Sequence, residues 1–432
     1  MLVRQIFFIL LPQKLTLIKL LLWAGLSLLL TNSFARTIRV GSKELVHSIV
    51  DGITQAVPGD TILVQPGIYR EGNILLQKSV SIIGVNYPVL DGENTYEILT
   101  IHASNVVIRG IRFINTGVGS MNDLAAVKGL DAKGLRIVDN LFENTFFGIY
   151  LANSSQSWIE DNKLSADVNA KHQIGDGIHL WKCADITVTN NWIKGHRDGI
   201  YFEFVTESLI KHNHSEGNMR YGLHFMFSHN DEYRNNTFIN NGAGVAVMYT
   251  KGVKMINNVF EHNWGSSSYG LLLKDIRDSF VTGNKFQGNS VGIHMEGSSR
   301  IEFKENTFTL NGYAIRLQAS CDDNIFEHNN FTGNTFDIVT NGSLVMNTIN
   351  HNYWDKYEGY DLNHDHVGDV PHHPVSLYGM IIERIPTAVL LWRSFLVLLM
   401  DRAEKAVPSI TPENMKDDLP SMKPYDLLHK HQ

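Results

Sequence analysis

An asparagine followed two positions later by an apolar residue recurs at a nearly constant spacing along residues 140–331. The steps between successive asparagines are 22, 29, 22, 23, 22, 26, 22 and 23 residues, and only the pair at Asn213 lacks the apolar partner. A glycine keeps the same period between residues 148 and 292. Two marks in phase over nine units indicate stacked supersecondary repeats. The asparagines are Asn140, Asn162, Asn191, Asn213, Asn236, Asn258, Asn284, Asn306 and Asn329.

The residues after each glycine alternate between apolar and variable positions. In one unit Ile178 and Leu180 are apolar while His179 lies between them, and the other units follow the same order. This period of two predicts a strand with one buried face, whereas helical repeats need spacings of three and four. With glycines at the bends and asparagine amides bonding from coil to coil, the chain predicts an all-β, right-handed parallel β-helix of about 22-residue coils.

The two ends of the chain differ from the repeats. Residues 1–35 resemble a signal peptide, because a basic leader precedes an apolar run at 20–30 and a small-x-small cleavage site at 33–35. An uncleaved anchor is the alternative. Residues 43–57 place apolar side chains on one helical face, with Ser42 as a candidate N-cap, so we expect a short helix covering the open end of the solenoid.

The segment 377–400 is strongly apolar, yet Glu383, Arg384, Pro386 and Arg393 interrupt it. Its longest clean run is too short for a spanning helix. We therefore expect a helix docked on a membrane or on a membrane-protein partner, with packing back on the solenoid as an equal alternative. The predicted segments are a signal peptide at 1–35, an N-terminal cap at 36–58, the β-helix at 59–355, an acidic and histidine-rich loop at 356–376, and the apolar helix with an extended tail at 377–432.

The net charge argues against one class of partner. The chain of 432 residues carries a formal charge of −7, and loss of the leader with Arg4, Lys14 and Lys19 would bring it to −10. An acidic exported protein is a poor candidate for nucleic-acid binding.

The outward positions of the strands after the glycines form columns that hold candidate metal ligands. Thioether and imidazole groups together suit Cu(I) and suit magnesium or calcium poorly. Ordinary surface residues are the alternative. The candidates on one face of four successive coils are His179, Glu203, His224, Met226 and Met248. Unusually long loops at the adjacent corner carry Met121, His172 and His262.

Two aspartates support a different hypothesis. Asp176 and Asp198 precede the repeating glycine in adjacent coils, so their carboxylates could stack about 5 Å apart. That separation is used by glycosidase carboxylate pairs, which would make the protein a polysaccharide lyase or hydrolase of the β-helix class. The alternative is that short aspartates at bends bond to the backbone.

A third group of candidates lies beyond the repeats. Oxygen ligands at alternate positions, followed by glycine and aspartate, resemble a calcium loop. These residues are Asp361, Asn363, Asp365 and Asp369. Because His364 and His366 stand between them, a transition-metal site and a simple polar terminus are the alternatives.

Several longer strings give the chain a family resemblance. It closely resembles the NosD family of periplasmic accessory proteins for nitrous oxide reductase maturation. The strings are GDGIHLWKC (175–183), HRDGIYFEF (196–204), RYGLHFMFSHND (220–231), GAGVAVMY (242–249) and the apolar stretch 374–408 with TPE at 411–413.

The resemblance implies a β-helix working in the periplasm with an ABC transporter, made of a permease and an ATPase. It also implies that copper reaches nitrous oxide reductase from a copper-donor lipoprotein, and that 377–400 contacts the permease or the membrane. We therefore predict a non-enzymatic carrier that receives Cu(I) and delivers it to the apo-reductase. The polysaccharide enzyme using Asp176 and Asp198 and a metal-free scaffold remain as alternatives.

Overall fold

The computed structural model describes residues 35–119, 123–166, 174–342, 346–406, 411–412 and 415–427. All but the last residue of the predicted signal peptide, and the loop residues Met121 and His172, lie outside the described residues.

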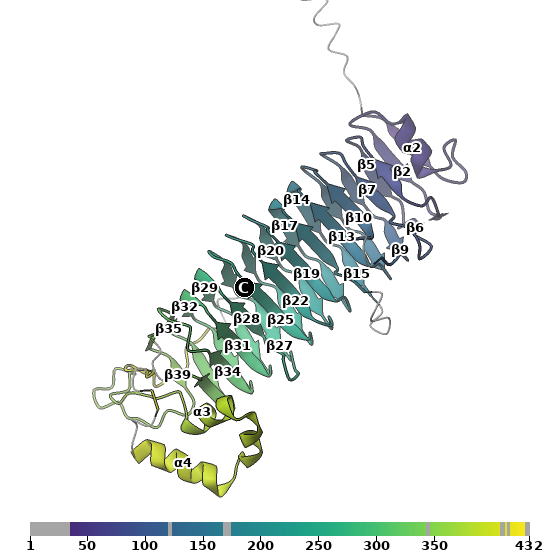
Figure 1. The fold of residues 1–432 in the computed structure, drawn as a ribbon. Coiled ribbons are helices and arrows are strands. Elements are labelled where there is room, and N and C mark those ends of the chain that lie inside the picture. Colours follow the sequence, from purple (N-terminus) through teal and green to yellow (C-terminus); the bar gives the residue numbers. More distant parts are fainter. Residues whose placement is uncertain are drawn as a thin grey trace, which may run out of the picture. The chain divides into compact units, whose positions relative to one another are not determined.

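The chain forms a right-handed parallel β-solenoid of about 13 turns, as predicted (Figure 1). Three parallel sheets make up its sides, and each coil contributes strands to them in turn.

Sheet 1 has fourteen strands in the described part of the chain. They are β1 Thr37–Val40, β2 Thr61–Val64, β5 Ser81–Gly84, β8 Val107–Arg109, β11 Arg136–Val138, β14 Ser155–Glu160, β17 Ala184–Thr189, β20 Leu209–Lys211, β23 Glu232–Arg234, β26 Lys254–Ile256, β29 Arg277–Thr282, β32 Ser299–Lys304, β35 Ile325–Glu327 and β38 Thr348–Asn350.

Sheet 2, which carries the outward columns, has twelve strands among the described residues. They are β4 Ile74–Leu76, β7 Leu99–Ile101, β10 Ala125–Leu130, β13 Phe147–Ala152, β16 Ile178–Trp181, β19 Asp198–Glu203, β22 Tyr221–Met226, β25 Ala243–Met248, β28 Leu271–Lys274, β31 Val291–Glu296, β34 Tyr313–Leu317 and β37 Phe336–Thr340.

Sheet 3 has thirteen strands over the same described ranges. They are β3 Ile68–Tyr69, β6 Val89–Asp91, β9 Arg112–Ile114, β12 Leu141–Glu143, β15 Lys163–Ser165, β18 Trp192–Lys194, β21 His214–Glu216, β24 Thr237–Ile239, β27 Val259–Glu261, β30 Lys285–Gln287, β33 Thr307–Thr309, β36 Asn330–Thr332 and β39 Tyr353–Trp354.

The repeating asparagines form a ladder inside the solenoid. The amide of each donates to the side-chain oxygen of the next, as from Asn236 to Asn258 and from Asn258 to Asn284, at 3.0 Å in both cases. The same oxygens accept the backbone N–H of the preceding asparagine. Buried polar groups are stable when paired in this way, so the ladder fixes the register of successive coils.

The repeating glycine has a different role from the one that the pattern suggested. These glycines do not mark left-handed bends, since the corners with positive φ use other residues. A Cβ on Gly199 would instead lie 2.6 Å from the Gly222 carbonyl oxygen of the next coil. Glycine is required because the coils approach each other too closely for a side chain.

The N-terminal helix is shorter than predicted. Helix α2 spans Ile49–Gln55, and its N-cap is Ser48 rather than Ser42. The carboxylate of Glu71 accepts the backbone N–H groups of Ile49 and Val50 at 2.8 and 2.9 Å, which places the helix start there. Leu45, one of the apolar residues of the segment 43–57, is fully exposed.

The apolar C-terminal segment folds into three short helices. They are α3 Leu377–Arg384, the 3-10 helix η2 Pro386–Leu391 and α4 Phe395–Ala406. Helix α3 packs on β37, and Glu383 accepts from Arg316 of β34 at 2.8 and 2.9 Å. Within the described residues, no helix is both long and apolar enough to cross a membrane. One face of this segment stays uncovered, since Leu390 is 86% exposed and Phe395 78%.

The described part of the tail returns to the last coils instead of extending away. The buried carboxylate of Asp417 accepts from the backbone N–H and the amide of Asn352 at 2.9 and 3.2 Å, and from the indole N–H of Trp354 at 3.0 Å. Asp417 therefore terminates the asparagine ladder.

Candidate functional site

The outward columns of sheet 2 have the predicted register. His179 pairs with Tyr201, and Tyr201 pairs with His224. In the next column Glu203 pairs with Met226, and Met226 pairs with Met248. The five candidate copper ligands thus lie on four successive strands, β16, β19, β22 and β25.

The first of these columns is a stack of rings rather than an open row of side chains. The ring centroids of Tyr150 and His179 lie 4.9 Å apart, those of His179 and Tyr201 4.7 Å, and those of Tyr201 and His224 4.8 Å. His224 is consequently buried, with 6% of its surface exposed.

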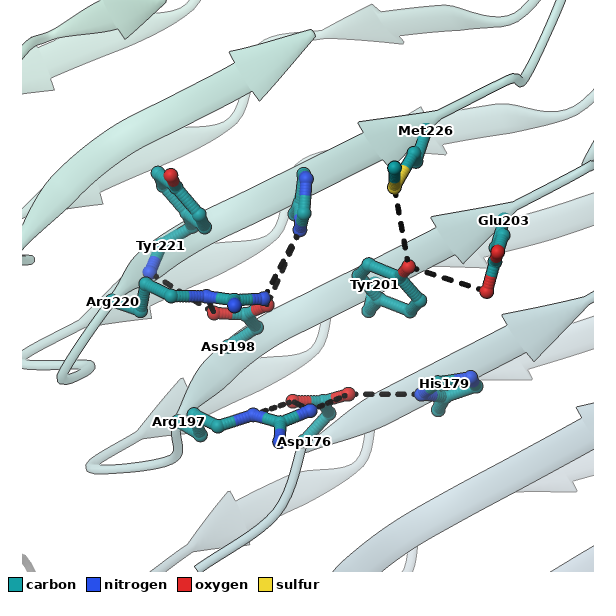
Figure 2. A network of polar contacts seen from close by, with 10 residues as sticks. Asp176, His179, Arg197, Asp198, Tyr201, Glu203, Arg220, Tyr221 and Met226 are labelled. Carbon is teal, nitrogen blue, oxygen red and sulfur yellow. Dashed lines mark hydrogen bonds and ion pairs between the residues drawn. The ribbon is translucent and has the colours of Figure 1, made fainter. Parts of the chain in front are cut away.

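Asp198 lies at the His224 end of this stack, and Figure 2 shows it beside Arg220. Arg220 of the next coil donates through both Nε and Nη2, with the Nε bond at 2.9 Å, and the Nδ1 of His224 lies 3.4 Å from the carboxylate. Burial raises the pKa of Asp198, but the hydrogen bonds from His224 and Arg220 outweigh it, so the pKa lies below its usual value. The carboxylate is therefore ionised at neutral pH.

Asp176 repeats the arrangement one coil earlier. Its carboxylate is 2.8 Å from the Nδ1 of His179 and accepts from the Nε of Arg197 at 3.2 Å. In both coils an aspartate binds a histidine of the outward column and an arginine from the coil above. Neither arginine was identified from the sequence, although each directly precedes the first residue of the strand in its own coil.

These contacts weaken the glycosidase hypothesis. The side chains of Asp176 and Asp198 are both 0% exposed, and each is bound by an arginine and a histidine. A glycosidase carboxylate must reach the glycosidic oxygen or the anomeric carbon of a bound sugar. The alternative, that these aspartates bond to the backbone, is met only in part. Both bond mainly to side chains, and Asp198 accepts one backbone N–H, from Tyr221 at 3.3 Å.

His224 has an unpaired ring nitrogen. Its Nδ1 faces Asp198 and Arg220, at 3.4 and 3.3 Å, whereas its buried Nε2 has no hydrogen-bond partner in the described part of the chain. A buried polar atom without a partner costs free energy of the order of 1–3 kcal/mol. A histidine bound to a carboxylate through one nitrogen and free at the other is the usual arrangement of a metal ligand.

Tyr201 connects the two columns, and sequence reasoning missed it as part of the site. Its hydroxyl lies 3.3 Å from the Oε2 of Glu203 and 3.7 Å from the sulfur of Met226, so its one proton can be donated to either acceptor (Figure 2). Burial, followed by the charge of Glu203, raises the pKa of Tyr201 well above its usual value, so the hydroxyl remains a donor. Its place in the histidine column was the signal that could have identified it.

The predicted calcium loop uses its oxygens internally. Asp361 accepts the backbone N–H groups of Asp365 and His366 at 3.2 and 2.9 Å, and Asp369 accepts that of Leu362 at 2.6 Å. Asn363 and Asp365 are joined to each other at 3.0 Å. These bonds fit the polar-terminus alternative, and nothing among the described residues supports calcium.

No cluster of three or more histidine, cysteine, aspartate or glutamate side chains in the described ranges could hold a metal ion. A copper site here would therefore depend on the methionines. His262, the described loop candidate, is half-exposed and lies beside Glu261 at 3.5 Å.

The family profile that matches this chain is described by the metal that it binds. The family profile described as "Periplasmic copper-binding protein (NosD)" matches residues 165–362, which include all five candidates. A Pseudomonas aeruginosa protein, "Probable ABC transporter binding protein NosD", is 27% identical over 87% of this chain and 91% of its own length. The protein of the same name from Stutzerimonas stutzeri is 25% identical over 87% of this chain and 92% of its own length. The chain belongs to the NosD family. Its relatives are named as binding proteins, not as enzymes.

Solved structures confirm the fold alone. A profile for the right-handed β-helix region matches residues 68–204. The catalytic unit of the GH87 alpha-1,3-glucanase from Streptomyces thermodiastaticus has a TM-score of 0.53 at 15% identity, covering 71% of this chain and 65% of its own. The surface adhesin PfbA of Streptococcus pneumoniae has a TM-score of 0.53 at 12% identity, covering 69% and 94%. An enzyme and an adhesin share this architecture, so the fold does not assign the activity.

Proposed function

We propose that this protein is a periplasmic carrier that receives Cu(I) and, with an ABC transporter, delivers it to apo nitrous oxide reductase. The observation that carries the proposal is the unpaired Nε2 of His224 next to the column of Met226 and Met248. The copper-binding description of the family supports the choice of metal.

The donor set suits transfer rather than permanent storage. Thioether and imidazole are soft, neutral ligands that bind Cu(I) without losing a proton. His224, Met226 and Met248 would supply the first ligands, with His179 and Glu203 continuing the two columns toward the N-terminal coils. Asp198 would orient the imidazole of His224. A metal held by such groups can pass to a partner by ligand exchange, with no covalent step.

The partners follow from the names of the relatives and from the C-terminal helices. Both relatives are named as ABC transporter binding proteins. The exposed apolar face that includes Leu390 and Phe395 fits a permease or the adjoining membrane surface. Upstream, a copper-donor lipoprotein would load the site.

Copper loading of the reductase tests this function. Nitrous oxide reductase would be purified from cells that lack this protein, carry it unchanged, or carry Met226→Leu with Met248→Leu. We expect full copper content only with the unchanged protein. A fully loaded reductase in cells with the double variant, at equal protein levels, would show that the two methionines are not needed for copper delivery.

Truncation before Ser376 tests the transporter contact separately. The shortened protein should no longer co-purify with the permease and its ATPase. Because truncation also removes Asp417 from the end of the asparagine ladder, the paired substitutions Leu390→Ser and Phe395→Ser provide a control that keeps the tail. If both proteins still co-purify with the transporter, the contact lies elsewhere.

A further inference from the structure

Tyr201 touches four of the five candidate copper ligands. Its ring lies between the imidazoles of His179 and His224, at 4.7 and 4.8 Å, and its hydroxyl lies between Glu203 and Met226. Each of these four neighbours belongs to β16, β19 or β22, so a single side chain contacts both outward columns at the centre of the site.

We propose that the Tyr201 hydroxyl lowers the copper affinity of this site by holding the sulfur of Met226 when no copper is bound. The inference rests on the proposed function, since it concerns the same site. Sulfur coordinates copper through its lone pairs, and a hydroxyl that donates to the sulfur occupies one of them. Copper that approaches along that lone pair must displace the hydroxyl from Met226.

Release of the Met226 sulfur costs little free energy because the Tyr201 hydroxyl has a second acceptor. When it leaves the sulfur, it can donate to Glu203, whose Oε2 is already 3.3 Å away. A thioether is a weak acceptor, so the contact that copper must displace is weak as well. Competition of this strength would weaken copper binding by about two- to fivefold, which favours release to a partner over retention.

Tyr221 provides a matched control in the neighbouring coil. Its ring also lies 4.8 Å from the imidazole of His224 and beneath the guanidinium of Arg220, and its backbone N–H donates to Asp198. Among the described residues, its hydroxyl has no hydrogen bond to a methionine sulfur. Tyr201→Phe and Tyr221→Phe each remove one hydroxyl beside the same histidine. Only the first removes a donor to sulfur.

The first measurement uses the full-length protein without copper. The methyl carbons of methionine are labelled with ¹³C, and the signal of Met226 is assigned by its loss in Met226→Leu. We expect the Met226 methyl resonance to move in Tyr201→Phe and to stay in place in Tyr221→Phe. An unmoved resonance in Tyr201→Phe overturns the inference, because the hydroxyl then does not hold the sulfur.

The second measurement is an anaerobic Cu(I) competition titration of the same variants. Tyr201→Phe should bind Cu(I) about two- to fivefold more tightly and release it more slowly to a chelator, while Tyr221→Phe matches the unchanged protein. Equal or weaker binding by Tyr201→Phe overturns the regulatory role alone. If the unchanged protein takes up no copper, the proposed function fails and the regulatory role with it.

Discussion

Two stacks of polar side chains run along the same coils, one inside the solenoid and one on the outer face of sheet 2. The inner stack is the asparagine ladder, in which each amide donates to the coil above and each oxygen accepts from the coil below. The outer stack contains Tyr201 and His224, where a buried imidazole nitrogen has no partner among the described residues. The ladder completes its hydrogen bonds within the protein, whereas the outer stack leaves a ligand atom available.

We infer from this difference that the inner column is structural and propose that the outer one is functional. Both are periodic and both contain buried side chains, so neither period nor burial alone distinguishes them. A buried network whose bonds are all made stabilises the fold, and a buried donor or acceptor left over is retained at a cost in stability. The cost is explained if another molecule supplies the missing partner.

The largest effect should come from breaking the inner ladder. Asn258→Ala removes the acceptor of two bonds from Asn236 and the donor to Tyr233 and Asn284. We expect a loss of about 2–4 kcal/mol in the free energy of unfolding, with copper affinity unchanged, measured by urea denaturation and Cu(I) titration. Lys254→Ala, with a side chain 55% exposed, is the control and should cost little. An undiminished stability in Asn258→Ala would mean that the ladder does not support the fold.

The stability of the protein should depend on pH because a buried histidine, His196, adjoins a second asparagine ladder. The backbone N–H of His196 donates to Asn218, and Asn218 donates to Asn241 in the next coil. Burial lowers the pKa of His196 to about 4, with a smaller opposing contribution from the backbone of Gly175. The unfolded chain binds this proton near pH 6.5, so it holds more protons than the folded protein between pH 6.5 and about 4.

Stability should therefore fall as the pH falls through that window, by up to about 3 kcal/mol from this one group. His196→Asn replaces the titrating ring with the residue of the ladder and should flatten this part of the profile. Denaturation midpoints between pH 7 and 4 would check it. Parallel profiles for the two proteins would show that His196 is not the source of the acid sensitivity.

A smaller effect, on copper affinity, is expected from removing the carboxylate at the His224 end of the outer stack. Asp198→Asn removes the ionised partner of Arg220 and of the Nδ1 of His224. Loss of a carboxylate that orients a histidine ligand typically weakens metal binding by tenfold or more, so we expect Cu(I) affinity to fall about tenfold. Asp278→Asn, which breaks the half-exposed ion pair with Arg300, should leave the affinity unchanged. Equal Cu(I) affinities in the two variants would show that Asp198 does not contribute to copper binding.

The periodic parts of the molecule could be predicted from the sequence because each coil repeats the same local chemistry. The pairing of Met226 with Met248 and of Tyr201 with His224 follows directly from the alignment of asparagines and glycines. The glycine column was recognised although its cause is the close approach of coils, as at Gly199, and not a bend.

Contacts between non-repeating groups could not be predicted in the same way. Asp417 returns from the tail to Asn352, and Glu383 of α3 binds Arg316 of β34. Such pairs depend on the paths of loops and tails, which periodicity does not describe. The start of α2 at Ile49 likewise depends on Glu71, a residue 22 positions further along the chain.

An anaerobic Cu(I) competition titration, against a chromophoric chelator, tests the central claim most directly. It would use the protein from Arg36 onward, the paired Met226→Leu and Met248→Leu variant, and Met346→Leu as a control at a methionine that is 66% exposed. We predict stoichiometric uptake by the unchanged protein and the control, and loss of uptake in the double variant. Uptake that survives the double substitution would contradict this site, and no uptake by the unchanged protein would contradict the carrier itself.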